Sequence, residues 1–247
     1  MKVYIGTSGW NYKHWKGLFY PEEIPESKWL EYYSRFFNTV EINMTFYRFP
    51  DEKSVEKWEK MVPAGFLFSV KGNRIITHVK KLKDIENLLK RFLTIISLFG
   101  RKLGPVLFQL PPSFAFKKER LNEFCKVLSS QNIIEKGKFS IEMREKSWLN
   151  EETFSILKFY GISLCFSDYP ELEVSSPLTS SFAYIRRHGP SSLYSSCYTE
   201  KEIEEDSQFI LELIREKKDV FIYYNNDAYA WAVKNALQLK EKIEKCL

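Results

Sequence analysis

The sequence predicts an α/β fold, a single (β/α)8 barrel (TIM barrel) with a polar, partly charged interior. Segments with strand and helix patterns alternate along nearly all of the 247 residues, as they do in barrels of parallel strands. No linker or low-complexity tract interrupts the alternation, so residues 1–247 are expected to form one domain. Several predicted strands carry polar residues at every second position, as in TVEINMT at 39–45. Alternate side chains of a strand share a face, so one face of these strands is polar.

In the first half of the chain, the boundaries follow from periodicity and from turn residues. The predicted strands are 3–8, 39–47, 66–71 and 105–110, and the predicted helices are 27–37, 54–61, 84–99 and 118–128. The first helix is amphipathic because its apolar residues, Trp29 to Phe37, recur at helical spacing. The third is expected to have Asp84 as its N-cap and to end at Gly100. Two prolines, Pro111 and Pro112, end the fourth strand.

The second half repeats the alternation. Its predicted strands are 139–144, 162–167, 182–188 and 220–224, and its predicted helices are 151–160, 199–217 and 229–243. Gly161 is expected to end the first of these helices, and residues 168–179 have a loop composition. The alternative fold is a doubly wound open sheet. It is disfavoured because no strand is followed by a glycine-rich phosphate loop; GTSG at 6–9 is not G-x-G-x-x-G.

Composition excludes several classes of protein. No apolar stretch is long enough to span a membrane, and the N-terminus lacks a signal-peptide pattern, so a cytoplasmic protein without a membrane partner is expected. The four cysteines show no close pairing, which argues against a zinc ribbon, a redox pair or a disulfide scaffold. The net charge of +5 is milder than that of a dedicated nucleic-acid binder. It permits an anionic ligand.

Short sequence blocks, in order along the chain, resemble those of the YecE-like family (domain of unknown function 72). They are IGTSGW at 5–10, FYP at 19–21, VEIN at 40–43, TFY at 45–47, Lys71, TH at 77–78, GPVLFQLPP at 104–112, EMR at 142–144, SW at 147–148, Arg186, HG at 188–189 and NND at 225–227. Two residues, Met44 and Tyr224, depart from the family pattern, and neither is one of the charged residues proposed for the site. The resemblance implies a TIM barrel and no particular activity, so the activity must be argued from the residues.

Charged and amide side chains are predicted to face the inside of this barrel. Val40 and Ile42 suit the helix-facing side of the second strand, which places Glu41 and Asn43 inside. The same alternation turns inward Lys71, Gln109, Glu142, Arg144, Arg186, His188 and Asn225. Asp168 and Asp227 follow the sixth and eighth strands. Because barrel active sites lie at the C-terminal ends of strands, these residues define a candidate site.

The residue types suggest roles. Lys71, Arg144 and Arg186 outnumber the inner glutamates and would hold a phosphate or carboxylate, with Asn43, Gln109, Asn225 and His78 as further polar contacts. Trp10, Tyr47 and Trp148 would supply an aromatic rim. His188 is the candidate proton carrier, and Glu142, Asp168 and Asp227 are candidate catalytic carboxylates.

These residues leave several functions open. The leading hypothesis is a hydrolase or lyase acting on a phosphate-bearing sugar, a nucleotide or a nucleic-acid end. A carboxylate-dependent glycosidase or sugar isomerase using Asp168 and Asp227, or Glu142, is an alternative. A non-catalytic module for nucleic acid or protein is another, with KKLK at 80–83 as its nearest basic run. The inner charges could also form a purely structural ion-pair network.

No cofactor is required by the sequence. A single Mg²⁺ or Mn²⁺ could be held by Glu142, Asp168, His188 and Asp227, whereas a zinc cluster is disfavoured because the chain has only three histidines. The expected partner is a small anionic molecule, with nucleic acid as the alternative. The oligomeric state is left open.

Overall fold

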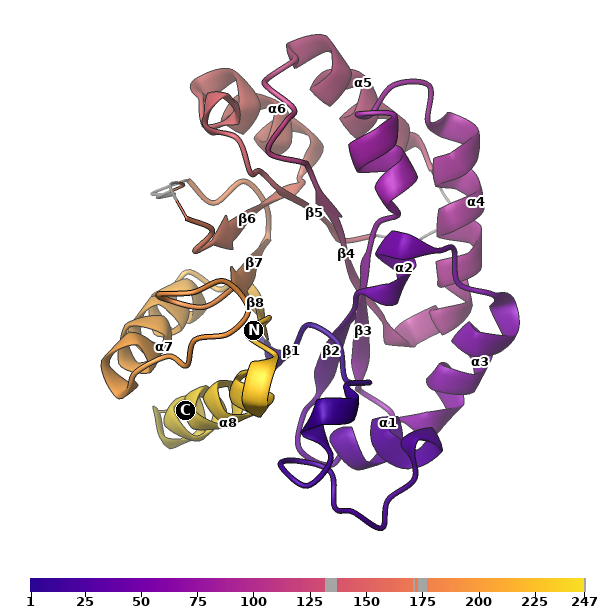
Figure 1. Cartoon of the computed structure of the whole chain (residues 1–247). Coiled ribbons are helices and arrows are strands. Elements are labelled where there is room, and N and C mark those ends of the chain that lie inside the picture. The colour runs from indigo at the N-terminus through magenta and orange to yellow at the C-terminus, as the bar shows by residue number, and fades with distance from the viewer. Residues whose placement is uncertain (132–136, 171, 173–176, 247) are drawn as a thin grey trace.

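The computed structural model describes residues 1–131, 137–170, 172 and 177–246. Within these residues, eight parallel strands form a nearly closed barrel with helices around it, as Figure 1 shows. The strands are β1 (Val3–Thr7), β2 (Thr39–Ile42), β3 (Leu67–Lys71), β4 (Leu103–Gln109), β5 (Phe139–Glu142), β6 (Ser163–Ser167), β7 (Phe182–Arg187) and β8 (Asp219–Tyr224). Their hydrogen-bonded order is β1-β8-β7-β6-β5-β4-β3-β2. The predicted (β/α)8 barrel is therefore confirmed.

The helices lie outside the strands or across their ends. The α-helices of the described residues are α1 (Trp29–Tyr33), α2 (Met44–Tyr47), α3 (Glu52–Met61), α4 (Glu86–Ile96), α5 (Lys118–Ser130), α6 (Glu151–Tyr160), α7 (Glu200–Arg215) and α8 (Trp231–Cys246). Short helical turns cover Lys13–Trp15, Glu26–Lys28, Ile75–Val79, Ser97–Lys102, Lys146–Trp148 and Ala228–Ala230. The predicted loop over 168–179 lies partly outside the described residues.

The barrel closes between β1 and β2 through a short parallel bridge. Ser8 pairs with Glu41, and the amide of Gly9 donates to the Glu41 carbonyl at 2.8 Å. Lower in the same seam, a Cβ on Gly6 would lie 2.3 Å from the Thr39 carbonyl oxygen. Only glycine allows the two backbones this close approach.

Several predicted boundaries were wrong, among them the end of the second strand and the start of the helix predicted at 84. The second strand ends at Ile42 instead of continuing to residue 47, because α2 begins at Met44. The Thr45 hydroxyl anchors that turn by contacting the Ile42 carbonyl at 3.0 Å and the Lys71 carbonyl at 2.6 Å. Asp84 is not an N-cap: it adopts a positive φ of 49°, and α4 begins at Glu86. Gly161 is confirmed as the end of α6, with a φ of 66°.

The inside of the barrel differs along its axis. Near the N-terminal ends of the strands, Tyr4 stacks on Phe221 with ring centroids 4.6 Å apart, and Phe182 packs beside them. Near the C-terminal ends, Glu41, Glu142 and Arg186 are fully buried. Val40 and Ile42 of β2 pack in the apolar layer outside the strands. The predicted alternation therefore places a charged layer inside the barrel toward the C-terminal ends of its strands.

Candidate active site

The centre of the site is one arginine between two glutamates. From β7, the Arg186 guanidinium donates to Glu41 Oε1 at 2.8 Å and Oε2 at 3.1 Å, and to Glu142 Oε2 at 2.6 Å. Arg186 Nη2 also donates to Ser8 Oγ at 3.0 Å. Because all three charges have no solvent-exposed surface, this pairing is what makes their burial tolerable. We call Arg186, Glu41 and Glu142 the inner cluster.

Both glutamates of the inner cluster are held ionised. Burial alone would raise the pKa of Glu142, but the Arg144 and Arg186 guanidiniums outweigh it and hold the pKa well below its usual range. Burial also opposes ionisation of Glu41, yet Arg186 and then Lys71 bring the pKa of Glu41 below its usual value. Neither carboxylate is therefore a proton donor near neutral pH.

Lys71 stands above the inner cluster at the end of β3. Its Nζ lies 4.4 Å from the centre of the Phe46 ring and makes no hydrogen bond or ion pair with any residue in the described part of the chain. Burial, together with the Arg186 guanidinium, lowers the pKa of Lys71 to about 7. An amine with a pKa of about 7 is partly protonated and partly neutral at neutral pH, so it can donate or accept a proton.

Arg144 follows β5 and lies opposite Lys71 at the C-terminal opening of the barrel, which we call the mouth. Its Nε donates to Glu142 Oε1 at 2.8 Å, and its Nη1 lies 3.3 Å from the Tyr194 hydroxyl. The guanidinium packs over the Tyr169 ring at 4.3 Å. The remaining N–H groups have no acceptor among the residues described, and the side chain is 9% exposed. Arg144 is thus oriented by three neighbours and keeps donors for a ligand.

His188 is placed beneath this mouth. Its Nε2 lies 3.2 Å from Glu142 Oε1, and its Nδ1 lies 3.0 Å from the Asn225 amide nitrogen. Burial and the Arg186 guanidinium lower the pKa of His188, which keeps the ring neutral near pH 7. With the Asn225 amide donating to Nδ1, the proton is on Nε2 and faces Glu142. His188 has no solvent-exposed surface.

His78 joins the mouth from the loop after β3. Its ring lies 4.9 Å from the Phe46 ring, edge to face. Burial and the Lys71 ammonium lower the pKa of His78 to about 4. Among the rim groups with a shifted pKa, only Lys71 therefore titrates near neutral pH.

The other predicted residues lie around this centre. The Asp168 carboxylate accepts from the His188 amide at 2.7 Å and from the Tyr198 hydroxyl, so it supports the end of β7. Asp227 lies 3.6 Å from His14, and burial raises its pKa. The structure therefore holds these two carboxylates in separate local networks. Gln109 is buried at the end of β4.

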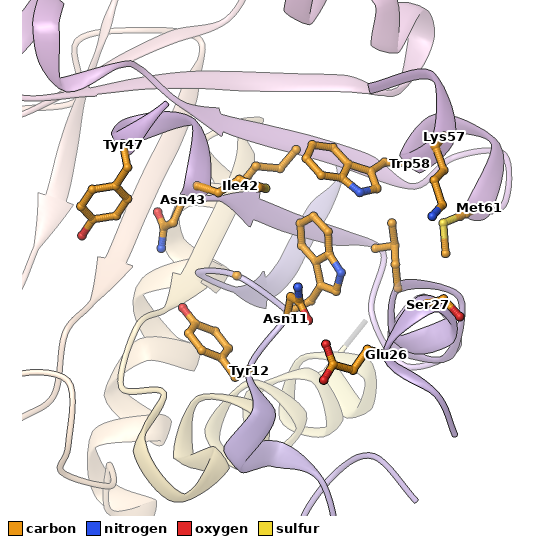
Figure 2. A pocket seen from close by; sticks show the side chains of 14 residues that line it. Asn11, Tyr12, Glu26, Ser27, Ile42, Asn43, Tyr47, Lys57, Trp58 and Met61 are labelled. Atoms are coloured by element: carbon orange, nitrogen blue, oxygen red, sulfur yellow. The ribbon is translucent and has the colours of Figure 1, made fainter. Parts of the chain in front are cut away.

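The three predicted rim aromatics differ in their surroundings. Trp148 has no exposed surface, packs against Phe114 and donates its indole N–H to the Phe114 carbonyl. It is therefore a core residue in this structure. Trp10 and Tyr47 instead line a pocket of about 510 Å³ next to the barrel mouth, shown in Figure 2.

This pocket, which we call the side pocket, lies between the loop after β1, the α2 turn, α1 and α3. Its lining residues are Gly9, Trp10, Asn11, Tyr12, Glu26, Ser27, Leu30, Ile42, Asn43, Met44, Tyr47, Lys57, Trp58 and Met61. Figure 2 shows Trp58 on one side of it, and Asn43 between Tyr12 and Tyr47 on the other.

The sequence did not reveal Tyr194 or Trp58. Tyr194 follows β7 in a loop with a positive φ of 64°, where no periodic pattern applies, and it reaches Arg144 only because the chain folds back. Trp58 has the spacing of an ordinary apolar residue of α3. Its edge-to-face contact with Trp10, at 5.4 Å, depends on the packing of α3 against the loop after β1.

A metal-binding arrangement is not evident in the described part of the chain: no group of three or more His, Cys, Asp and Glu side chains is gathered there. Glu142, Asp168, His188 and Asp227 do not form a ligand set in this conformation. Separately, none of the described helices combines the length and apolar character needed to cross a membrane.

Comparison with known proteins gives a consistent picture. The family model described as "Protein of unknown function DUF72" matches residues 4–246. The UPF0759 protein YunF of Bacillus subtilis is 28% identical over 275 residues, covering 98% of this chain and 95% of that protein. A DUF72 crystal structure from Thermotoga maritima is 32% identical, with a TM-score of 0.86 over 99% of this chain and 100% of that one. SacUVDE, at 12% identity and a TM-score of 0.62, shares the fold alone.

Proposed function

The chain belongs to the DUF72 family, and we propose that it is an enzyme acting on a small phosphate-bearing ring compound at the C-terminal mouth of its barrel. Lys71 and Arg144 bind the anionic group. Lys71 also carries the proton that the reaction moves, in hydrolase or lyase chemistry.

One observation carries this proposal. Two cationic side chains, Lys71 and Arg144, converge on the mouth with donors that the described protein atoms leave unused. The inner cluster and these two residues have three positive and two negative charges when Lys71 is protonated, which leaves one positive charge for a ligand. Arginine pairs with phosphate through two parallel hydrogen bonds, and a lysine next to it adds a point charge.

The predicted anion ligands differ in how many of their donors are already used. Arg186 is fully occupied by Glu41, Glu142 and Ser8, so it holds the site together and leaves anion binding to the other two cations. A purely structural network accounts for the inner cluster. It does not account for Lys71. Burial lowers the pKa of Lys71, and no hydrogen bond to a described residue offsets the cost of burying its charge.

Proton transfer falls to Lys71 for reasons of access and pKa. With a pKa of about 7, its amine is available as a general base or acid at neutral pH. His188, by contrast, is fully buried and directs its proton to Glu142. It acts as a positioning residue, because it fixes Glu142 and, through Glu142, the direction of Arg144.

The carboxylate-based alternative has less support. A glycosidase needs two carboxyl groups facing each other across an open space. Glu41 and Glu142 are enclosed by arginines, and Asp168 is occupied by the His188 amide and Tyr198. The non-catalytic alternative relied on the basic run at 80–83, where Lys81 is occupied by the Ser113 carbonyl.

Sulfate titration tests the anion site, because the charge of sulfate is constant above about pH 3. We expect sulfate affinity, measured by calorimetry, to fall as the pH rises through the Lys71 pKa of about 7. Lys71→Arg should bind sulfate without this pH dependence, and Lys71→Met should lose binding. Exposed Lys80 at the same barrel end provides the matched control, Lys80→Met. Sulfate binding that is equal in wild type and Lys71→Met would refute the proposed site.

A further inference from the structure

We infer that the side pocket is the subsite for a nucleobase, so that the substrate is a nucleotide whose phosphate lies at Lys71 and Arg144. This inference rests on the proposed function and specifies its substrate class. It is carried by the shape of the side pocket, by one unpaired amide oxygen and by an exposed aromatic ring.

The lining suits a flat, largely apolar ring. Trp10 and Trp58 meet edge to face at 5.4 Å, and Leu30, Met44 and Met61 add apolar surface. Glu26 and Lys57 contribute one charge of each sign, and Glu26 also lies 3.7 Å from Lys13. A sugar buried here would need a hydrogen-bond partner for each of its hydroxyl groups, and each unpaired one is costly. A base presents apolar faces and needs polar partners only along its edge.

Asn43 provides such a partner. Its amide nitrogen donates to Ser8 Oγ at 2.7 Å. Ser8 Oγ already donates its proton to Glu41 and accepts from Arg186, so it can only accept from Asn43. The inner cluster therefore fixes which way the amide points. The Asn43 Oδ1 atom is left buried, without a hydrogen-bond partner among the residues described.

A buried unpaired acceptor is costly, and a ligand N–H would satisfy it. In Figure 2 the Asn43 nitrogen lies on the Tyr12 side and its oxygen on the Tyr47 side. Each of the four common nucleobases carries at least one N–H donor on its edge. Asn43 would therefore contact the base through its oxygen while its nitrogen is held by Ser8, a member of the network that also holds the anion site.

Tyr47 links the side pocket to the anion site. Its ring is 72% exposed, unusual for a large apolar surface, and it lies at the edge of the pocket. It contacts Phe46 edge to face at 5.1 Å, and Phe46 in turn carries Lys71 over its ring. A ring stacked on Tyr47 is therefore next to the residues that would hold its phosphate.

The test compares the four nucleoside 5′-monophosphates with ribose 5-phosphate and sulfate, by calorimetry. At least one nucleotide should bind about tenfold or more tightly than ribose 5-phosphate, as one base stacked on an aromatic ring provides. Tyr47→Ala should abolish that difference and leave ribose 5-phosphate affinity unchanged. Phe159→Ala is the matched control, because Phe159 is 82% exposed on α6.

The Asn43 contact has its own test. An analogue of the tightest nucleotide, methylated at its ring N–H or amino donor, should bind about tenfold more weakly than the parent to wild type. Asn43→Ala should bind both equally, and thermal melting checks that this variant is folded. A 5′-phosphorylated trinucleotide identifies the source of the ligand: tighter binding than the mononucleotide would indicate a nucleic-acid end.

The outcomes separate the two proposals. If ribose 5-phosphate and sulfate bind in a Lys71-dependent way but no nucleotide binds more tightly, the nucleobase subsite is refuted and the anion site stands. If Tyr47→Ala leaves nucleotide affinity unchanged, the subsite is refuted as well. If sulfate does not bind at all, the proposed function fails.

Discussion

Two neighbouring arginines of β7 face opposite sides of the barrel wall. Arg186 points inward to Glu41 and Glu142, and Arg187 points outward to Asp206 of α7 at 2.8 Å. The outer pair is completed by the Tyr224 hydroxyl, which donates to Asp206 at 2.8 Å. Both arginine side chains are largely shielded from solvent, and each is paired with a carboxylate.

The difference lies in what surrounds each pair. The outer pair joins a strand to the helix that covers it and has a stabilising role that needs no ligand. The inner cluster is surrounded by Lys71, Arg144 and Asn43, each with polar groups that no described residue satisfies. Buried charge alone therefore does not mark a site. Unused donors and acceptors next to buried charge do.

Removing the inner arginine should give the largest effect. Arg186→Met leaves Glu41 and Glu142 buried without their shared partner, and breaking such pairs costs about 3–5 kcal/mol. We expect urea unfolding to show a larger loss than for Arg187→Met, whose partner Asp206 keeps the Tyr224 hydrogen bond. Equal losses in the two variants would contradict the distinction between the two pairs.

Acid should weaken the inner cluster in a defined direction. Folding lowers the pKa of both Glu41 and Glu142, so their contribution is fully present above the ordinary glutamate pKa and is lost as the pH falls through the lower folded values. Glu142→Gln should cost about 2–3 kcal/mol near pH 7 and show a shallower loss of stability below pH ~4.5. Unfolding free energies from pH 6 down to 3, for both proteins, measure this. Parallel curves would mean that Glu142 is not held ionised.

The charged form of Lys71 should destabilise the fold, whereas the charged forms of Glu41 and Glu142 stabilise it. The Lys71 pKa of about 7 lies below the ordinary lysine pKa of 10.5, so the unfolded chain binds more protons between these values and stability rises with pH across that window. Lys71→Met should therefore stabilise the protein by about 1–2 kcal/mol at neutral pH, with the gain vanishing toward the unfolded pKa. Thermal melts at several pH values test this. A destabilised Lys71→Met would show that the amine supports the fold.

The smallest effect should come from the hydroxyl that orients Arg144. Tyr194→Phe removes a 3.3 Å contact on an exposed residue, so the unfolding free energy should change by less than about 0.5 kcal/mol. Sulfate affinity should fall about two- to threefold, because Arg144 loses one of its three orienting neighbours. Tyr224→Phe is the matched outer variant and should lower stability by about 1 kcal/mol without changing sulfate affinity. If Tyr194→Phe binds sulfate as wild type does, Arg144 is oriented by Glu142 and Tyr169 alone.

The sequence predicted the barrel and the inward residues because both depend on local periodicity. Strand and helix signals alternate, and alternate side chains of a strand share a face, so Glu41, Glu142 and Arg186 could be placed inside before any contact was known. The error at residue 42 has a tertiary cause. The Thr45 hydroxyl contacts the Lys71 carbonyl on the next strand, and that contact has no signature in the sequence around it.

Which inward residues remain available to a ligand was decided by the tertiary structure alone. Arg186 and Ser8 are 178 positions apart and meet across β8, and Glu41 of β2 joins them where the barrel closes between β1 and β2. Ser8 also accepts from the Asn43 amide, whose oxygen has no partner among the described residues. Glu41 and Glu142 satisfy Arg186, while Lys71 and part of the Arg144 guanidinium keep donors that no described residue uses. Periodicity determines the face on which a side chain lies. Whether its hydrogen bonds are satisfied depends on strands that only the closed barrel brings together.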